Sequence, residues 1–194
     1  MKRRLLLLAL LNIPMFAQKR LIEGNPASEV RVVVYEDLQC PDCADFRAML
    51  DTKLLPKYGA AVAFEHRDFP LPKHSWAKRG AIAARFIQEQ SEEKAHAYRR
   101  TLLQALRAIK PDTFEAHLRE WCGKNGLDGA AAVAALSDSR LTRLVEDDYE
   151  DGVARGIAKT PTVLVNGQPF IERFPYEDLA AAIDRELKAT EKKK

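Results

Sequence analysis

Two cysteines separated by two residues are the part of this 194-residue chain best suited to carry chemistry. They are Cys40 and Cys43, with Pro41 and Asp42 between them. A β-branched run ending at Tyr35 predicts a buried strand, and the apolar residues after the second cysteine are spaced as on one face of a helix. Residues three apart on a helix lie on the same side, within about 5–6 Å, the separation that a disulfide needs. The pair can therefore close into a disulfide and reopen.

The predicted start of this helix gives the two thiols different roles. Pro41 suits the first helical position, because its missing N–H costs nothing there and its φ angle is already helical. Cys40 then lies at the cap, where unpaired backbone N–H groups and the positive end of the helix dipole favour a thiolate. We expect Cys40 to have a lowered pKa and to be the nucleophile, and the more shielded Cys43 to be the resolving thiol.

Half of a zinc site, or two buried structural cysteines, are the alternative interpretations of this pair. Structural zinc sites use about four ligands, usually with a second Cys or His pair. The remaining candidates are only Cys122 and four scattered histidines, so we expect a redox pair, no metal and no cofactor. Cys122 follows Trp121 late in a predicted amphipathic helix, and we expect it to be buried and unreactive.

The N-terminus, residues 1–17, has the pattern of a cleavable signal peptide. A basic start is followed by an apolar run to Phe16 and by the small residue Ala17. The run is too short to cross a bilayer, which takes about 20 residues. We therefore expect export, to the periplasm or otherwise out of the cytosol, where disulfides persist.

Export would change the charge balance of the chain. The full sequence has 31 basic and 28 acidic side chains, and three of the basic ones lie in residues 2–4. Without them the chain carries 28 of each, which offers no electrostatic reason to bind nucleic acid or an anionic membrane surface. We expect no nucleic-acid partner.

After the cysteines, the sequence predicts helices enclosed by strands. The expected elements are a strand at 61–66, a helical block at 75–155, a hairpin at 162–171 and a closing helix at 176–187. The hairpin is indicated by an Asn-Gly dipeptide between two short β-branched or aromatic runs. The order is therefore strand, helix, strand, helical block, hairpin and helix.

Three stretches resemble the DsbA-like family of exported thiol–disulfide oxidoreductases, within the thioredoxin-like superfamily. Residues 35–43 are similar to the active-site stretch of that family, and residues 67–77 resemble its second-strand exit. Residues 156–162, with the following Asn-Gly turn, resemble its Thr-Pro loop and hairpin.

The resemblance implies an α/β, thioredoxin-like fold with an inserted all-helical subdomain. Residues 18–74 and 156–190 would form the thioredoxin-like domain, and residues 75–155 the helical insertion. It also implies a monomer that acts on reduced or misoxidised substrate proteins and peptides and is recycled by a membrane redox partner.

The resemblance also assigns roles to individual residues. Cys40 matches the nucleophilic cysteine and Cys43 the resolving one. Pro161 matches the cis-proline that faces the disulfide, with Thr160 before it, although the sequence does not give the isomer. The backbone of Thr160 would then pair with an extended segment of the substrate.

Many thioredoxin-like proteins have a buried acid six residues before the first cysteine, where this chain has Val34. Glu36 and Asp37 are nearby acids, but we expect them on the turn, in a solvated or capping role. His74 follows the second strand; the resemblance would allow it to lie near the active-site face, but we expect it to be a polar surface residue.

The dipeptide between the cysteines is the second feature in which this chain differs from the family. DsbA-type oxidants often carry Pro-His there, and the imidazole favours the thiolate. Asp42 instead places a negative charge beside Cys40, which raises a thiol pKa and makes the disulfide a weaker oxidant. Lys159 would partly offset this charge if its side chain turned toward the sulfurs.

We therefore expect an exported thiol–disulfide oxidoreductase that acts as a moderate oxidant. Besides a non-catalytic peptide-binding module, which would leave the two cysteines without a function, two alternatives remain open at this point. The first is the same chemistry used by a reductase or isomerase. The second is a periplasmic copper chaperone that holds copper(I) with Cys40, Cys43 and a histidine, since soft thiolates suit that ion.

Overall fold

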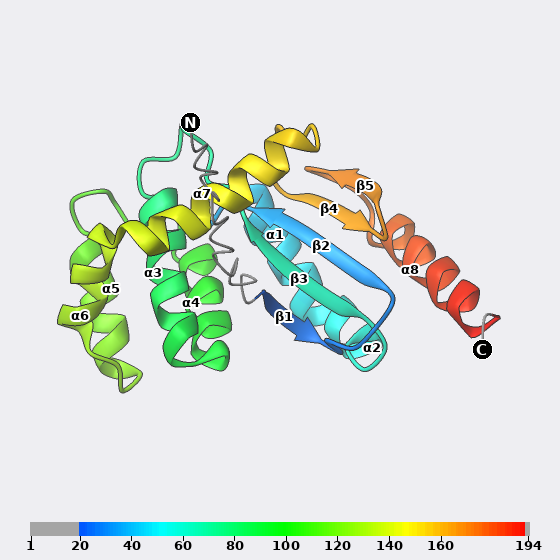
Figure 1. Cartoon of the computed structure of the whole chain (residues 1–194), viewed down its shortest axis with the longest axis horizontal. Coiled ribbons are helices and arrows are strands. Elements are labelled where there is room, and N and C mark those ends of the chain that lie inside the picture. The colour runs from blue at the N-terminus through cyan, green and yellow to red at the C-terminus, as the bar shows by residue number, and fades with distance from the viewer. Residues whose placement is uncertain (1–19, 193–194) are drawn as a thin grey trace, which may run out of the picture.

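The computed structural model describes residues 20–192 of the chain, so the predicted signal peptide at 1–17 lies outside the described residues. Five strands form one mixed sheet in the order β1-β3-β2-β4-β5 (Figure 1). β2 and β3 run parallel, and the other neighbouring pairs are antiparallel. The strands are β1 (Leu21–Gly24), β2 (Arg31–Glu36), β3 (Ala63–Asp68), β4 (Thr162–Val165) and β5 (Gln168–Ile171).

Helices surround this sheet and form a separate group at one side of it (Figure 1). They are α1 (Pro41–Met49), α2 (Leu55–Tyr58), α3 (Ala77–Gln90), α4 (Glu92–Gln104), α5 (Phe114–Lys124), α6 (Gly129–Ala134), α7 (Ser139–Ala154) and α8 (Tyr176–Glu191). Among the described residues, none of the helices has both the length and the apolar character to span a bilayer.

The two faces of the sheet bury different sets of side chains. One face packs against α1, α2 and α8 through a core that includes Val32, Val34, Val163, Phe46, Leu54, Leu179 and Ile183. On the other face, Tyr35 meets Phe69 edge to face, and Phe69 stacks on Tyr149 of α7 with 4.6 Å between ring centroids. The sheet is thus a middle layer between helices, as in an α/β fold.

The segment from Ala77 to Ala154 contains helices and no strand. Its core continues to the first turn of α1, because Trp76, Tyr98 and Phe114 belong to the same buried cluster as Cys40 and Cys43. The predicted α/β fold with a helical insertion is confirmed. The exact boundaries of that insertion, 75 and 155, stay a prediction.

Three local details differ from the expectation. The strand β1 was not expected; its four residues pair with β3 along the edge of the sheet. β3 begins at Ala63 and ends at Asp68, two residues later than expected. The sequence also suggested that the cysteine helix ends at residues 53–56, but its path continues through a π-helical turn at Leu50–Leu54 into α2. Pro56 lies in the first turn of α2, where its missing N–H is tolerated.

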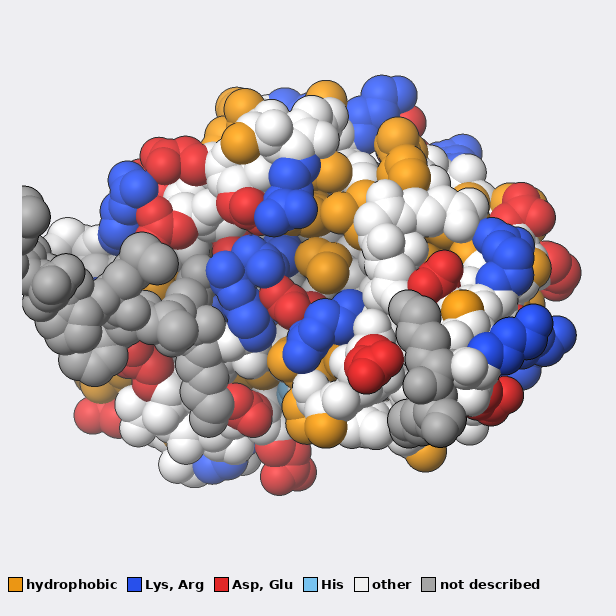
Figure 2. Space-filling model, turned by 45° about the vertical axis from the view of Figure 1, so that its right-hand side comes forward, with side chains coloured by type: hydrophobic (Ala, Val, Ile, Leu, Met, Phe, Trp, Pro, Cys, Tyr) orange, Lys and Arg blue, Asp and Glu red, His pale blue; other side chains and the backbone are white. Residues whose placement is uncertain are grey.

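Basic and acidic side chains are interspersed on the face of the molecule shown in Figure 2. Exposed ion pairs join side chains of opposite sign in the structure, such as those of Lys78 with Glu146 and of Arg140 with Glu89. This alternation of signs agrees with the balanced charge expected from the sequence.

Gly152 allows α7 to approach the sheet closely. A Cβ atom at this position would lie 2.7 Å from two ring carbons of Phe69 and 3.1 Å from Tyr35. Both rings are buried, at 2% and 1% exposure, and a packed interior gives way only at a cost. The glycine is therefore a packing requirement of this helix–sheet contact.

We predict that Gly152→Ala lowers the free energy of unfolding by about 1–3 kcal/mol, because the added methyl group overpacks the contact. Gly123→Ala is the matched control, since a Cβ there has nothing within 4 Å. It should raise the free energy of unfolding by up to about 1 kcal/mol through helix propensity. Denaturant titrations of both variants test this, and an equal effect of the two would contradict the packing argument.

Candidate active site

Cys40 caps α1 at the end of the turn that leaves β2. Its backbone is extended, with φ −88° and ψ 125°, and Pro41 is the first residue of the helix. The amide of Cys40 donates to the carbonyl of Asp37 at 3.0 Å, and its own carbonyl accepts from Ala44 at 3.1 Å. The local sequence thus builds the helix start that the Cys-Pro pair predicts.

The loop before β4 brings a distant part of the chain to this helix start. The Sγ atom of Cys40 lies 3.4 Å from the carbonyl oxygen of Thr160, across 120 residues of sequence. The peptide bond between Thr160 and Pro161 is cis, which settles the isomer that the sequence left open. The expected cysteine pair and the expected Thr-Pro loop are therefore neighbours in the structure.

The two thiols of the pair have opposite pKa shifts. Both are free and buried. A hydrogen bond from the thiol of Cys43 lowers the pKa of Cys40 to about 6, against the effect of burial and with help from the amides of Cys43 and Asp42. Burial, followed by the hydrogen bond and the charge of Cys40, raises the pKa of Cys43 well above its usual value. At neutral pH one sulfur is thus a thiolate and the other a thiol.

Asp42 and Lys159 both have partners in the β5–α8 loop. Arg173 binds the carboxylate of Asp42 at 2.9 Å, and Glu172 accepts from Lys159 at 2.7 Å. The sequence suggested that Lys159 could offset the charge of Asp42, but Lys159 pairs with Glu172 instead. That compensation comes from Arg173 instead.

Glu36 and Asp37 are not solvated: Glu36 is the last residue of β2, and Asp37 has the capping role that was the other expectation for the turn. Their exposed fractions are 3% and 1%, and Val34 is fully buried in the apolar core. The carboxylate of Glu36 contacts His66 at 2.8 Å and Arg99 at 3.1 Å. Burial alone would raise the pKa of Glu36, but these positive groups lower it to about 2.

Asp37 links the cysteine helix to the loop that follows β3. One carboxylate oxygen accepts from the amide of Gln39 at 2.7 Å. The other accepts from the amide of Leu71 at 2.6 Å and contacts Nδ1 of His74 at 2.8 Å. The amide of Asp37 itself donates to the Sγ atom of Cys43 at 3.4 Å. Asp37 does make a turn contact through Gln39, but as a buried residue.

His74 is consequently not the surface residue that the sequence suggested. Its side chain is 15% exposed and is held by Asp37. Sequence reasoning missed the pair because 37 residues separate the two side chains. The signal that could have found it is that both residues follow parallel strands that end at the same edge of the sheet, Asp37 directly after β2 and His74 in the loop after β3.

Cys122 is fully buried in the helical block, and burial raises its pKa to about 11. The geometry agrees with the expected unreactive thiol.

One cluster among the described residues has ligand atoms spaced closely enough for a metal ion. Glu23, His66 and His96 place one ligand atom each within 4.8 Å of one another. Arg47 and Arg100 both bind the carboxylate of Glu23. A cation would compete with two guanidinium groups for the same oxygens, so we assign this cluster to the ion pairs of the fold rather than to a metal.

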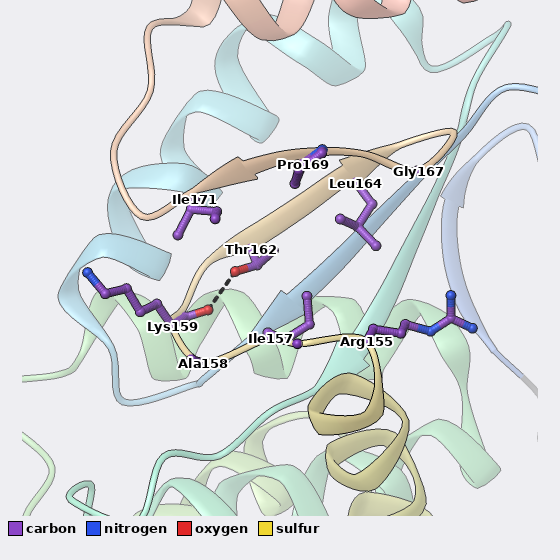
Figure 3. A pocket seen from close by; sticks show the side chains of 10 residues that line it. Arg155, Ile157, Ala158, Lys159, Thr162, Leu164, Gly167, Pro169 and Ile171 are labelled. Carbon is purple, nitrogen blue, oxygen red and sulfur yellow. Dashed lines mark hydrogen bonds between the residues drawn. The ribbon is translucent and has the colours of Figure 1, made fainter.

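A surface pocket of about 420 Å³ lies along the segment that leads to the Thr160-Pro161 loop (Figure 3). Ile157 and Lys159 border it from this segment, Leu164 from β4 and Ile171 from β5. The hydroxyl of Thr162 donates to the carbonyl of Lys159 at 2.7 Å and closes the turn (Figure 3). Neither cysteine lines this pocket, so the chemistry belongs to the helix start and not to the pocket.

The pKa difference between the thiols leads to a prediction for the reduced protein. Thiolate absorbance should appear with a midpoint near pH 6, and Cys40→Ser should abolish that transition. Cys43→Ala should move the midpoint upward, because it removes the largest cause of the low pKa. Ultraviolet titrations in a Cys122→Ser background measure this, and a midpoint unaffected by Cys43→Ala would show that the hydrogen bond is not the cause.

The fold is similar to several solved structures of thiol–disulfide exchange proteins. BdbD from Bacillus subtilis matches with a TM-score of 0.75 and 20% identity, over 87% of this chain and 93% of that one. Alpha-DsbA1 from Wolbachia pipientis matches with a TM-score of 0.78 and 16% identity, over 91% and 96%. A thioredoxin-like oxidoreductase from Silicibacter pomeroyi matches with a TM-score of 0.71 and 23% identity, over 87% and 92%.

Two curated relatives are much longer proteins. The Na(+)/H(+) antiporter NhaA 1 of Mycolicibacterium gilvum is 26% identical over 181 residues, which is 91% of this chain and 27% of the relative. NhaA 3 of Salinispora tropica is 26% identical over 175 residues, or 89% of this chain and 26% of the relative. The chain thus spans about a quarter of the length of the curated relatives it matches.

The family comparison covers nearly the whole described chain. Residues 17–185 match the family described as Thioredoxin. The chain belongs to the thioredoxin family, and its fold is that of the DsbA-type thiol–disulfide oxidoreductases.

Proposed function

We propose that this protein is an exported thiol–disulfide oxidoreductase that exchanges disulfides with substrate proteins through Cys40 and Cys43. The observation that carries the proposal is the pairing of a thiol with a pKa of about 6 and a thiol with a strongly raised pKa, one helical turn apart. A thiol with a low pKa is a good leaving group. Its stable thiolate also stabilises the reduced form of the protein relative to the disulfide form.

In the oxidising direction, the protein starts with a Cys40–Cys43 disulfide. A substrate thiolate attacks Sγ of Cys40, a bond forms between these two sulfurs, and Cys43 leaves with the electron pair of the broken disulfide. A second substrate thiolate then attacks the first substrate sulfur and releases Cys40 as a thiolate. The substrate is oxidised by two electrons, and the protein is reduced by two.

The Thr160-Pro161 loop is the proposed contact for the substrate backbone. It faces Cys40, and an extended segment that pairs with Thr160 would bring its own sulfur to that atom. The hydroxyl of Thr160 is buried and has no hydrogen-bond partner in the described part of the chain. A polar group of the incoming segment would satisfy it.

We infer a moderate oxidant rather than a strong one. The helix start and the Cys43 thiol stabilise the Cys40 thiolate, which favours the reduced protein and makes its disulfide oxidising. The negative charge of Asp42 opposes this effect. The ion pair with Arg173 partly neutralises the charge of Asp42 and so weakens its effect on the Cys40 thiolate. This arginine is 84% exposed, and solvent screening limits its influence.

The proposal places the protein outside the cytosol, as the signal peptide predicts, where a membrane redox partner would restore its disulfide. Reduced or misoxidised proteins and peptides would be its substrates. Antiport, named for the longer curated relatives, is not part of the proposal.

The decisive measurement is the equilibrium of the Cys40–Cys43 pair with glutathione buffers, in a Cys122→Ser background. We expect a two-electron couple with a potential above about −180 mV, at or above the range of protein disulfide isomerase. A value near that of thioredoxin, about −270 mV, would instead indicate a reductant. Absence of any two-electron couple would refute the redox proposal.

Asp42 and Arg173 should change this equilibrium in opposite directions. Asp42→Asn removes the negative charge beside Cys40, so it should lower the thiol pKa and make the disulfide more oxidising. Arg173→Ala leaves the charge less compensated and should do the reverse, by less than about tenfold in the equilibrium constant because the pair is exposed. Shifts of both variants in the same direction would rule out this electrostatic account.

A further inference from the structure

His66 lies on β3 with its ring between carboxylates from the two neighbouring strands. Its Nδ1 atom is 2.8 Å from an oxygen of Glu36 on β2, and its Nε2 atom is 3.0 Å from an oxygen of Glu23 on β1. The side chain is 2% exposed, so it is shielded from solvent. Both ring nitrogens therefore face an acceptor within hydrogen-bond distance.

A neutral imidazole can satisfy only one of these two contacts. It has one N–H donor, and its other nitrogen is an acceptor, whereas an ionised carboxylate only accepts. The bare nitrogen of a neutral ring would face a carboxylate oxygen with lone pairs on both atoms. Two donors are needed at this place, and the imidazolium has them, unless one of the carboxyl groups itself carries a proton.

Arginines around the two carboxyl groups keep both of them ionised. Two guanidinium groups bind Glu23, and Arg99 binds Glu36 at 3.1 Å. A guanidinium group always carries its charge, so these contacts favour the ionised carboxylates. Burial raises the pKa of each acid, but His66 and then the arginines lower that of Glu36 to about 2 and that of Glu23 below its usual range. The second proton therefore belongs to the histidine.

A second histidine, His96 of α4, lies beside Glu23 in a different state. Its Nδ1 atom is 3.6 Å from the carboxylate and has no hydrogen-bond partner in the described part of the chain. The ring centroids of His66 and His96 are 5.8 Å apart. Burial, followed by the charge of His66, lowers the pKa of His96 to about 4. Since two imidazolium groups at this separation would repel each other, a charged His66 requires a neutral His96.

We propose that His66 stays protonated in the folded protein at neutral and mildly alkaline pH and acts as a cationic clamp between β1, β2 and β3. The clamp holds Glu36, which is the last residue of β2 before the turn that leads to Cys40. His66 is thus a positioning residue for that strand end. The inference does not depend on the function proposed above.

Charged and titratable side chains of several elements surround this histidine. They are Glu23 of β1, Glu36 of β2, Arg47 of α1, Asp51 of the π-helical turn, and His96, Arg99 and Arg100 of α4. The arginines keep their charge at every pH used below, and the neighbouring histidine titrates near pH 4. A charge change in this group between pH 6 and 9 therefore reports His66.

The direct test is the number of protons on the ring of His66 in the folded parent protein. Nitrogen-15 NMR of histidine-labelled protein distinguishes protonated from bare ring nitrogens. The signals that remain when each of the other three histidines is replaced by Gln in turn belong to His66. At pH 7.5 an ordinary histidine, with a pKa of about 6.5, is mostly neutral. We expect two protonated nitrogens on His66 at this pH and one bare nitrogen on His117 of α5, the control.

The titration of His96 gives a second readout of the charge on His66. His66→Gln removes that charge, so the pKa of His96 should rise by about one unit from its value of about 4. At pH 5, His96 should then be mostly neutral in the parent protein and about half protonated in the variant. His117→Gln should leave the pKa of His96 unchanged. A folded His66→Gln variant with an unshifted His96 would contradict the proposal.

The stability of the protein as a function of pH gives a third readout. Burial lowers the pKa of His66, but the charges of Glu36 and Glu23 raise it above its usual value. The contribution of the clamp to folding is therefore complete below about pH 6.5 and is lost as the pH rises through the raised pKa. Denaturant titrations measure the folding equilibrium constants, and the ratio of parent to variant cancels the titration of the thiols.

For His66→Gln we expect this ratio to fall by about tenfold or more between pH 6 and pH 9. The ratio for His117→Gln should not fall, because burial lowers the pKa of that histidine. A ratio for His66→Gln that stays constant over this range would show that His66 does not lose a proton there and would overturn the proposal.

A bare ring nitrogen on His66 at pH 7.5 would refute the clamp outright. That measurement is made on the parent protein, so it decides the question even if His66→Gln does not fold. None of the three measurements uses disulfide exchange. Failure of the clamp would therefore leave the chemistry of the cysteine pair intact, and failure of that chemistry would leave the clamp intact.

Discussion

The fold depends on the pairing of acids that are buried where two parallel strands end. Glu36 of β2 and Asp68 of β3 are register partners and are 3% and 1% exposed. Isolated carboxylates in such a place would be strongly destabilising. Arg99 of α4 binds both of them, at 3.1 and 2.7 Å, and Arg85 of α3 binds Asp68 at 2.5 Å. The helical block therefore has to lie against this end of the sheet, because it supplies the compensating charges.

This constraint also fixes the surroundings of the thiols. The chain leaves β2 at Glu36 and reaches Cys40 within four residues, so the cysteine helix starts directly beside the ion pairs. The helical block then covers Cys43 with apolar side chains, and the Thr160-Pro161 loop approaches Cys40 from the other end of the sequence. Burial on one side and backbone donors on the other separate the two thiol pKa values. The buried ion pairs thus determine both where the helical block packs and how the two thiols differ in pKa.

The sequence predicted the parts of this arrangement that depend on local rules. A proline between two cysteines, an Asn-Gly turn and a β-branched run each carry their own conformational preference, and the structure has the helix start and the hairpin at the expected residues. The burial of the acids was not predicted, because a charged side chain is expected in solvent unless its partner can be recognised in the sequence. Arg99 is 63 residues from Glu36, and His74 is 37 residues from Asp37. The short strand β1 was missed for a related reason, since its pairing with β3 rather than its own four residues defines it.

The acid that other thioredoxin-like proteins hold six residues before the first cysteine has no equivalent at Val34, whose side chain points into the apolar core. A carboxylate there would lie among Phe46, Leu50 and Val163 without a partner, and burial would strongly disfavour its charge. Asp37 lies instead beyond the strand end, where backbone amides of two loops and one histidine can serve it. The carboxylate of Asp37 thus ties the start of the cysteine helix to the loop after β3, while the backbone amide of the same residue donates to Cys43. The chain therefore keeps the core of the sheet apolar at Val34 and holds its buried acids at the strand ends, where arginines, histidines and backbone amides compensate them.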